Sequence, residues 1–408
     1  MSSSYFYFRP ILAADRSWVA LDWQPGVTAE ANDQNPPDFA RCFGESAAAP
    51  LANILPLIAT IEPSVLESAS FGEGFDARQV IFVLPGACVE NKQTLSRCNQ
   101  LHAQGYRLGL RLGNMDHLRK VPVATFDFLQ FEAKFARQEL SALDLNYIKD
   151  AGFNRIASHI GSHEMFGWLS DKGFDWYESD FLTKRNPLGE REPDLTRLKL
   201  LKLLNLVKQD GDTREIETIF REEPKLSYNL LRLVNSVAVG ARTKISSFSQ
   251  AIAILGRRQL QRWLQLLIYA DNLADGNTPN PLMQIAAARG RKMELLSEAI
   301  DPVLDLPDLK DNAFMTGLFS LLDVLINLPM SEILKELPLH SEVENALISP
   351  ASDGILGELL STIIAEESGN FLAAETRLAS LGISPETHAK AQVTALYWAS
   401  RINTDNHD

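Results

Sequence analysis

The sequence predicts a protein in two parts, an α/β half followed by an all-helical half. Up to residue 182, short runs rich in β-branched and aromatic residues alternate with helical patterns, which is typical of a parallel sheet or a βα barrel. From residue 194 onward, apolar residues recur at helical spacing almost throughout, which predicts packed helices. The stretch Phe181–Pro193 is charged and punctuated by proline and glycine. We therefore expect domains at 1–182 and 194–408, joined by a linker at 183–193.

The α/β half is expected to contain seven strands. They are Tyr5–Arg9, Trp18–Trp23, Val80–Leu84, Arg107–Leu112, Phe126–Phe131, Arg155–His159 and the more weakly patterned Asp175–Glu178. Helical patterns lie between them at Leu51–Glu67, Lys92–Gln104, Lys134–Asp150 and His163–Lys172. The segment Gln24–Pro50 is rich in proline, asparagine, aspartate and alanine, so we expect a long surface connection there.

The helical half is expected to begin with three consecutive helices within Phe220–Tyr269. Pro224 suits a first helical turn, and Gly240 and Gly256 suit helix ends. The later helices are expected at Leu282–Ile300, Asn312–Leu328, Ser331–Leu337, Glu342–Ile348, Ile355–Glu367, Leu372–Leu381 and Glu386–Ile402.

The composition excludes several classes of protein. Of the 408 residues, 45% are hydrophobic and 22% charged, which is typical of a globular chain. The net charge of −13 argues against binding to nucleic acid or to an anionic membrane. No apolar run approaches the length of a membrane span, and MSSSYFYFRP lacks the features of a signal peptide, so we expect a cytoplasmic protein. Cys42, Cys88 and Cys98 have no metal-type spacing and are expected to be free thiols.

Four motifs follow one another in the helical half. They are Glu-Glu-Pro-x-Leu at 222–226, Leu-Leu-Arg-Leu-Val-Asn-Ser at 230–236, Ile-Ser-Ser at 245–247 and Ala-Ile-x-x-Leu-Gly at 251–256. Together they resemble the HDOD domain, the helical, non-catalytic bacterial relative of HD-type phosphohydrolases. An HD hydrolase binds metals through histidines and an aspartate, whereas this chain has no histidine between Glu164 and Leu339, and Ser320-Leu321 stands where the His-Asp pair would be. We therefore expect no HD chemistry.

Five short segments also succeed one another in the α/β half. They are Phe8-Arg9-Pro10-Ile11, Val19-Ala20-Leu21, Gly105 to Leu110, Phe126 to Leu129 and Gly173-Phe174-Asp175. Their order and spacing resemble an EAL domain, a barrel that hydrolyses the messenger cyclic di-GMP with two metal ions. The resemblance implies a TIM-type βα barrel.

The chain departs from the EAL pattern where the metal ligands should stand. Such a hydrolase needs several carboxylates converging at strand ends. The substitutions are Val19 for Glu, Asp22-Trp23-Gln24 for Leu-Arg-Trp, Arg111-Leu112 for paired aspartates, Gln130-Phe131-Glu132 for Lys-Ile-Asp, Ser158 to Gly161 for Glu-Gly-Val-Glu and Glu178-Ser179 for Gln-Gly. The strand ending Val83-Leu84-Pro85 also lacks the expected Glu and Asn. We therefore expect a degenerate barrel without bound metal.

The remaining polar residues leave alternatives open. His159, His163 and Glu164 superficially suggest a metal site, but their order differs from the metalloprotease pattern, so surface or capping roles are preferred. Glu132 and Glu178 could form a carboxylate pair at the barrel mouth or be solvated leftovers. Arg111 could contact a phosphate or pair with Glu132.

A degenerate EAL-like half followed by an HDOD domain resembles the YuxH-type signal-transduction proteins of bacteria, along essentially the whole chain. We predict no catalytic residue, no metal ligand and no cofactor. The leading hypothesis is a non-enzymatic scaffold related to cyclic di-GMP signalling, which binds other signalling proteins through its helical domain and can form a homodimer. The alternatives are a metal-independent cyclic di-GMP sensor and a residual cyclic di-GMP phosphodiesterase.

Overall fold

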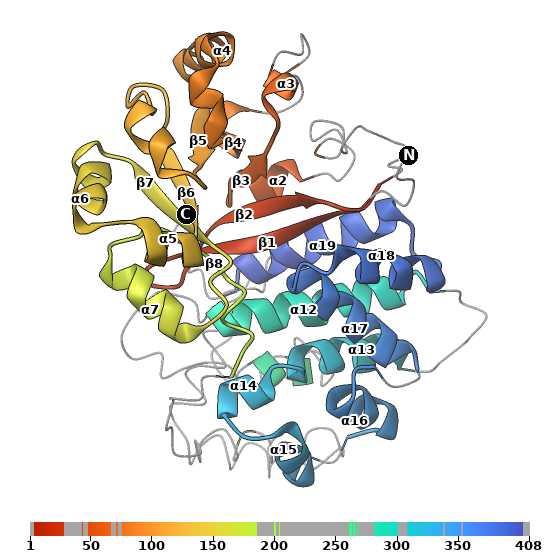
Figure 1. Cartoon of the computed structure of the whole chain (residues 1–408). Coiled ribbons are helices and arrows are strands. Elements are labelled where there is room, and N and C mark those ends of the chain that lie inside the picture. The colour runs from red at the N-terminus through yellow and green to blue at the C-terminus, as the bar shows by residue number, and fades with distance from the viewer. Residues whose placement is uncertain are drawn as a thin grey trace, which may run out of the picture. The chain divides into compact units, whose positions relative to one another are not determined.

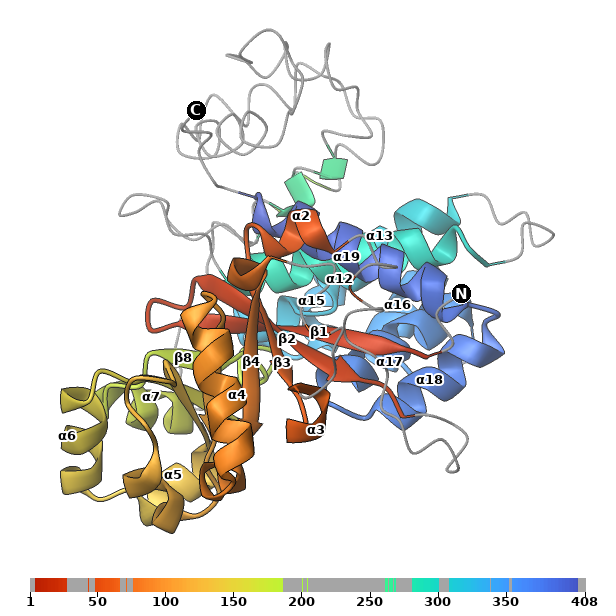
Figure 2. The same cartoon turned by 90° about the horizontal axis from the view of Figure 1, so that it is seen from above.

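The protein is described by a computed structural model (Figures 1 and 2). It describes residues 4–27, 43, 48–66, 71, 76–185, 200, 204, 261–262, 264–266, 268, 281–300, 308–337, 339–351 and 354–402. Two compact units are formed: the barrel unit, Met1–Lys184 with Ala365–Val393, and the helical unit, Arg185–Ile364 with Thr394–Asp408. The HDOD-like motifs at 222–256, the linker residues 186–193, Cys42 and most of Gln24–Pro50 lie outside the described residues. The predicted boundaries at 182 and 194 stay predictions.

The barrel unit is built on a closed barrel of eight strands in sequential order. The strands are β1 (Phe6–Ala13), β2 (Trp18–Pro25), β3 (Leu57–Thr60), β4 (Val80–Pro85), β5 (Arg107–Arg111), β6 (Phe128–Glu132), β7 (Asn154–Ser158) and β8 (Trp176–Glu178). Strand β1 is antiparallel to both of its neighbours, β2 and β8, and the other neighbouring pairs are parallel. The seven predicted strands are therefore confirmed, and the predicted α/β barrel with them.

The eighth strand, β3, corrects a prediction. The segment Leu51–Glu67, expected to be one helix, divides into α2 (Ala49–Ala52), β3 and α3 (Pro63–Leu66). Pro56 has no N–H to donate and disfavours a continuous helix, and its carbonyl accepts a hydrogen bond from Leu21 N at 3.0 Å. The apolar residues that follow are at most 1% exposed between β2 and β4, so burial in the sheet outweighs the helical pattern.

The segment Lys134–Asp150 was also predicted as one helix and forms two. They are α5 (Ala133–Glu139) and α6 (Ala142–Asp150). Ser141 begins the second helix with a capping box to Asp144, because its hydroxyl satisfies a helical N–H that has no partner within the helix. The other helices of the barrel are α4 (Lys92–Ala103) and α7 (His163–Asp171), with 3-10 turns at Ala77–Gln79, Gly86–Glu90 and Met115–Lys120.

Residues from the C-terminal half complete the barrel unit. Ala365–Val393, called the returning segment here, contains α18 (Phe371–Ser380) and the first part of α19 (Pro385–Ser400). Both views show α18 beside β1 (Figures 1 and 2), where Tyr7 packs on Ala374.

The interior of the barrel has an apolar layer below a polar one. Side chains alternate across each strand, so residues two positions apart face the same side. The apolar layer contains Ile11, Ala20, Ile58, Ile81, Val83, Phe128 and Ile156. Two positions from these residues stand polar ones, namely Arg9, Asp22, Thr60, Gln130 and Ser158. A polar rim therefore lies on a packed apolar core.

The helical unit contains α12 (Pro281–Ser297), α13 (Leu309–Phe319), α14 (Leu322–Ile326), α15 (Met330–Glu336), α16 (Ser341–Ile348) and most of α17 (Ile355–Glu367). The single helix predicted at Asn312–Leu328 is thus two helices. Helices α12 and α13 cross at two glycines: a Cβ built on Gly317 would lie 2.7 Å from the Cα of Gly290. Within the described ranges, no helix is long and apolar enough to cross a membrane.

Candidate functional site at the barrel mouth

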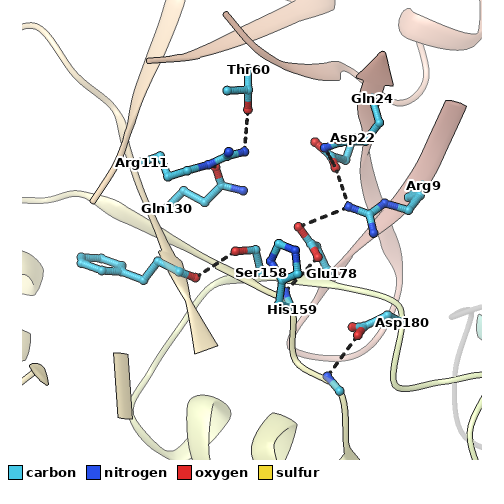
Figure 3. A network of polar contacts seen from close by, with 12 residues as sticks. Arg9, Asp22, Gln24, Thr60, Arg111, Gln130, Ser158, His159, Glu178 and Asp180 are labelled. Atoms are coloured by element: carbon cyan, nitrogen blue, oxygen red, sulfur yellow. Dashed lines mark hydrogen bonds and ion pairs between the residues drawn. The ribbon is translucent and has the colours of Figure 1, made fainter. Parts of the chain in front are cut away.

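The carboxyl ends of the parallel strands meet at one rim of the barrel, which we call the mouth. Figure 3 shows polar side chains from β1, β2, β3, β5, β6, β7 and β8 gathered there. This is the face on which βα barrels carry their functional residues. The gathering follows from the period-two alternation of the strands, and it makes the mouth the candidate site.

Arg9 lies between two buried carboxylates, Asp22 and Glu178 (Figure 3). Its Nη2 is 3.3 Å from Asp22 Oδ2 and 3.7 Å from Glu178 Oε1. The side chains are 15%, 1% and 4% exposed, respectively, so all three charges are removed from water. Gln24 Nε2 also donates to Asp22 Oδ2, at 2.6 Å. The arrangement is a buried ionic cluster of one cation and two anions.

Burial and neighbouring charges both shift pKa values in this cluster. Burial raises the pKa of Glu178, although the charge of Arg9 opposes the change. For Arg9, burial would lower the pKa, but the charges of Glu178 and Asp22 outweigh it and the pKa is raised. Arg9 Nε and Asp22 Oδ1 are buried and have no hydrogen-bond partner among the described residues. Two buried polar atoms of the cluster therefore make no hydrogen bond to the described residues at the mouth.

Glu178 is held in place from the neighbouring strand. The backbone N–H of His159 donates to Glu178 Oε2 at 2.9 Å, and His159 adopts a left-handed φ of 53°. The next carboxylate along the chain, Asp180, accepts from Gly161 N at 3.1 Å. The loop after β7 thus directs two N–H groups at two carboxylates on and just after β8.

Arg111 has neutral partners. Its Nε donates to Gln130 Oε1 at 3.1 Å, and its Nη2 donates to Thr60 Oγ1 at 2.8 Å. The predicted alternative of a pair with Glu132 is not the arrangement found, because these two hydrogen bonds direct the guanidinium to β3 and β6. The charge of Arg111 is therefore positioned without a carboxylate in either hydrogen bond.

The predicted pair, Glu132 and Glu178, lies in two different environments. Both stand at strand ends, but Glu178 is buried whereas Glu132 is exposed. Ser158, opposite Glu132 in the register, donates its hydroxyl to Phe131 O at 3.3 Å. Glu178 belongs to the ionic cluster, whereas Glu132 fits the alternative of a solvated residue that forms no carboxylate pair.

His159, His163 and Glu164 do not meet at one site. His163 begins α7, with its ring Nε2 3.1 Å from Lys184 O, whereas His159 lies on the preceding loop. Glu164 pairs with Arg137 at 3.1 Å. In the described part of the chain, no three or more His, Cys, Asp or Glu residues are grouped so that they could hold a metal ion. Cys88 and Cys98 are buried free thiols, and burial raises their pKa values to about 12 and about 11.

The helical unit has its own buried arginine. Ser320, at the end of α13, accepts a hydrogen bond from Arg289 Nη1 at 2.6 Å and donates to Gly317 O at 2.6 Å. Arg289 is 4% exposed, and burial raises the pKa of nearby Asp323 despite the charge of Arg289. The position expected to carry a His-Asp pair therefore holds a serine bonded to an arginine.

Arg9 is the site residue that sequence reasoning missed, together with Thr60 and Asp180. In the sequence, Arg9 ends the predicted strand Tyr5–Arg9 and belongs to the motif Phe8-Arg9-Pro10-Ile11. Its place two positions before Ile11 on a strand was the available signal, because an inward charge next to a core residue needs a partner.

Comparisons with known proteins agree with this architecture. Residues 195–357 match the model of the HDOD domain family. The chain is 24% identical over 309 residues to the protein YuxH of Bacillus subtilis, covering 73% of each chain. It is 25% identical over 249 residues to the cyclic di-GMP phosphodiesterase CdgJ of Vibrio cholerae, covering 61% of this chain and 56% of that protein. The chain thus matches little more than half the length of this second relative.

Two solved structures of EAL proteins are similar to part of the chain. The EAL enzyme Bd1971 in its cAMP-bound form has a TM-score of 0.34 at 12% identity, covering 43% of this chain and 61% of that one. An EAL domain protein from Listeria monocytogenes has a TM-score of 0.33 at 12% identity, covering 43% and 86%. The predicted HDOD domain and the predicted similarity to YuxH are confirmed. The chain therefore joins a closed eight-stranded barrel to an HDOD domain at residues 195–357.

Proposed function

We propose that the chain is a non-catalytic regulatory protein of cyclic di-GMP signalling. In this proposal the HDOD domain binds other signalling proteins in the cytoplasm, and the barrel is its platform and can provide a dimer contact. Similarity to CdgJ, a cyclic di-GMP phosphodiesterase, supports the relation to this messenger. The side chains at the mouth of the barrel support the further step, that the protein does not catalyse hydrolysis.

The observation that carries the proposal is the position of Arg9. Two catalytic metal ions would need several carboxylate oxygens available for coordination at the mouth. Asp22 Oδ2 instead accepts from both Arg9 and Gln24, and Glu178 pairs with Arg9 while accepting from the His159 amide. The carboxylate oxygens are arranged to accept hydrogen bonds from the guanidinium of Arg9. This arrangement does not fit a pair of divalent cations.

Arg111 adds a second obstacle to cation binding. It stands at the end of β5 and bonds to the neutral side chains of Thr60 and Gln130. A positive charge held at the mouth repels a nearby divalent cation, although Arg111 is exposed and water weakens this repulsion. Arg111 therefore favours an anion over a metal ion at this rim.

Arg111 also favours a second candidate function, a metal-independent sensor of cyclic di-GMP. An arginine fork suits phosphate oxygens, and the hydrogen bonds to Thr60 and Gln130 hold the side chain of Arg111 in place. The sensor and the scaffold share the loss of catalysis and differ in whether the mouth binds nucleotide.

One experiment separates these functions. The full chain, supplied with Mg²⁺ or Mn²⁺, is titrated with cyclic di-GMP by calorimetry, and the same samples are checked for hydrolysis products. The scaffold predicts neither binding nor turnover, whereas the sensor predicts binding without turnover that Arg111→Ala weakens. Hydrolysis that Glu178→Gln abolishes and the exposed control Glu132→Gln preserves would overturn both proposals.

A further inference from the structure

Strand β1 carries three side chains on one face, each in a different environment. Tyr7, Arg9 and Ile11 stand two positions apart and therefore share a face of the strand. Ile11 belongs to the barrel core, Arg9 lies in the ionic cluster of the mouth, and Tyr7 packs on Ala365 and Ala374 of the returning segment. One short strand thus reaches from the core, past the mouth, to the returning segment.

The returning segment is hydrogen-bonded to β1 on both sides of Tyr7. Gln392 Nε2 donates to Phe6 O at 2.8 Å, and Gln392 Oε1 accepts from Phe8 N at 3.2 Å. This amide takes the place that a neighbouring strand would take on a sheet edge. Between these bonds, the ring of Tyr7 stacks on Phe371 with centroids 4.5 Å apart and planes 4° from parallel. The position of Tyr7 is therefore fixed relative to α18.

A buried hydrogen-bonded pair joins the two ends of the returning segment. His388 Nε2 lies 2.9 Å from Glu366 Oε1, and the two side chains are 0% and 6% exposed. The ring of His388 also meets Tyr7 edge-on at 5.3 Å. A buried polar pair of this kind favours one discrete arrangement over a continuum, because misaligned partners would be left desolvated. Movement of Tyr7 is thus opposed by both ends of the segment.

The returning segment also comes close to Arg9. A Cβ built on Gly369 would lie 4.0 Å from Arg9 Nη1, and Gly369 has a φ of 78°, which favours glycine. The turn between α17 and α18 therefore lies against the guanidinium of the ionic cluster. Helices α17 and α19, which bound the segment, each continue along the chain into the helical unit.

We propose that β1 couples the barrel mouth to the returning segment, so that displacement of Arg9 from Asp22 and Glu178 loosens the packing of Tyr7 against α18. The expected trigger is an anionic, phosphate-bearing ligand, because it competes with carboxylates for a guanidinium. Since α17 and α19 continue into the helical unit, a change at the mouth has a covalent route to the HDOD domain. Coupling of this kind is reciprocal. It depends on the contacts of β1 and can be tested without any ligand.

The forward test replaces Arg9 in the full chain and follows amide hydrogen exchange. Arg9→Met keeps an unbranched apolar stem and removes the charged guanidinium. Exchange in α18 should become about fivefold faster or more, as for a typical coupling between sites, relative to any change in α6, which belongs to the same unit but not to this network. Arg9→Lys, which keeps the charge, should give a smaller increase and serves if the methionine variant does not fold.

The reverse test starts from the returning segment. Gln392→Ala should accelerate exchange of the His159 amide, which reports on Glu178 at the mouth, and the exposed control Gln93→Ala on α4 should not. Unchanged exchange in α18 of a folded Arg9 variant would overturn the proposal. An equal increase in α6 and α18 would also overturn it, because that result indicates general destabilisation. Neither result would bear on whether the protein hydrolyses cyclic di-GMP.

Discussion

The barrel mouth and the end of α13 each hold a largely buried arginine, which bonds to a carboxylate at the mouth and to a hydroxyl at α13. Arg9 is paired with the carboxylates of Asp22 and Glu178. Arg289 donates to the neutral hydroxyl of Ser320. Removing a buried cation from between two anions leaves uncompensated charge, whereas removing one hydroxyl leaves an unsatisfied donor. We therefore expect the removal of Arg9 to cost more stability than the removal of the Ser320 hydroxyl.

The largest effect expected is that of Arg9→Met on stability. The variant leaves Asp22 and Glu178 buried without their cation, which should lower the free energy of unfolding by about 3–5 kcal/mol. Urea titration of the full chain, followed by tryptophan fluorescence, measures this value. Arg9→Lys should recover part of the loss. A loss below about 1 kcal/mol, the size expected for an exposed pair, would show that the cluster is not a buried ionic unit.

The packing of the helical unit should respond next most strongly. Gly317→Ala places a Cβ 2.7 Å from the Cα of Gly290, so the crossing of α12 and α13 must open, at a cost of about 1–3 kcal/mol. Thermal unfolding measures the loss. Gly167→Ala in α7 is the matched control, since a Cβ there meets nothing within 4 Å, and it should stabilise by about 0.5–1 kcal/mol. Equal effects of the two variants would contradict the close crossing.

Ser320→Ala should lower the free energy of unfolding by less than Arg9→Met does. Loss of the hydroxyl leaves Arg289 Nη1 without the acceptor at 2.6 Å, which should cost about 1–2 kcal/mol. Ser320→Thr keeps the hydroxyl and should fall between the variant and the wild type. If Ser320→Ala proves as costly as Arg9→Met in the same urea titration, the two arginines are equally constrained and the comparison fails.

A pH dependence of stability is expected outside both arginine sites. Burial raises the pKa of Glu375 from 4.5 to about 7, although the Val27 N–H that it accepts at 2.6 Å opposes the shift. A carboxyl with a raised folded-state pKa binds its proton more tightly in the native state. Its stabilising contribution is therefore complete below about pH 4.5 and is lost as the pH rises through about 7.

Glu375→Gln provides the comparison for this titration. The amide keeps an oxygen acceptor for Val27 N and does not titrate, so the melting temperature of the wild type should fall relative to the variant between pH 4.5 and 7. Melting curves at several pH values measure the difference. A difference that stays constant over this range would mean that Glu375 titrates normally.

The fold was predictable wherever local patterns decide it. The alternating strands and the capped helices were found because their periodicity and end signals are local in sequence. Strand β3 was missed because Leu57–Thr60 is buried on both faces, and such a strand has no alternation to detect. The division of the helix at Lys134–Asp150 was missed because Ser141 resembles a helical surface residue until its side chain is seen to cap Asp144.

The candidate site was less predictable because its contacts are distant in sequence. Arg9 meets Glu178 only when β1 closes the barrel beside β8, where Ile11 lies opposite Glu178. Arg111 depends on Thr60 of the strand that was missed. The family resemblance marks the positions where the chain departs from the EAL pattern, but the partner of each charge there follows from closure of the barrel.

The central claim is that the guanidinium of Arg9 occupies the place of a cation at the mouth, and calorimetric titration of the full-length protein with Mn²⁺ tests it most directly. The account predicts no saturable binding by the wild type, and binding by Arg9→Ala that Asp22→Asn in the same chain abolishes. Saturable binding of Mn²⁺ by the wild type that Asp22→Asn or Glu178→Gln removes would contradict it.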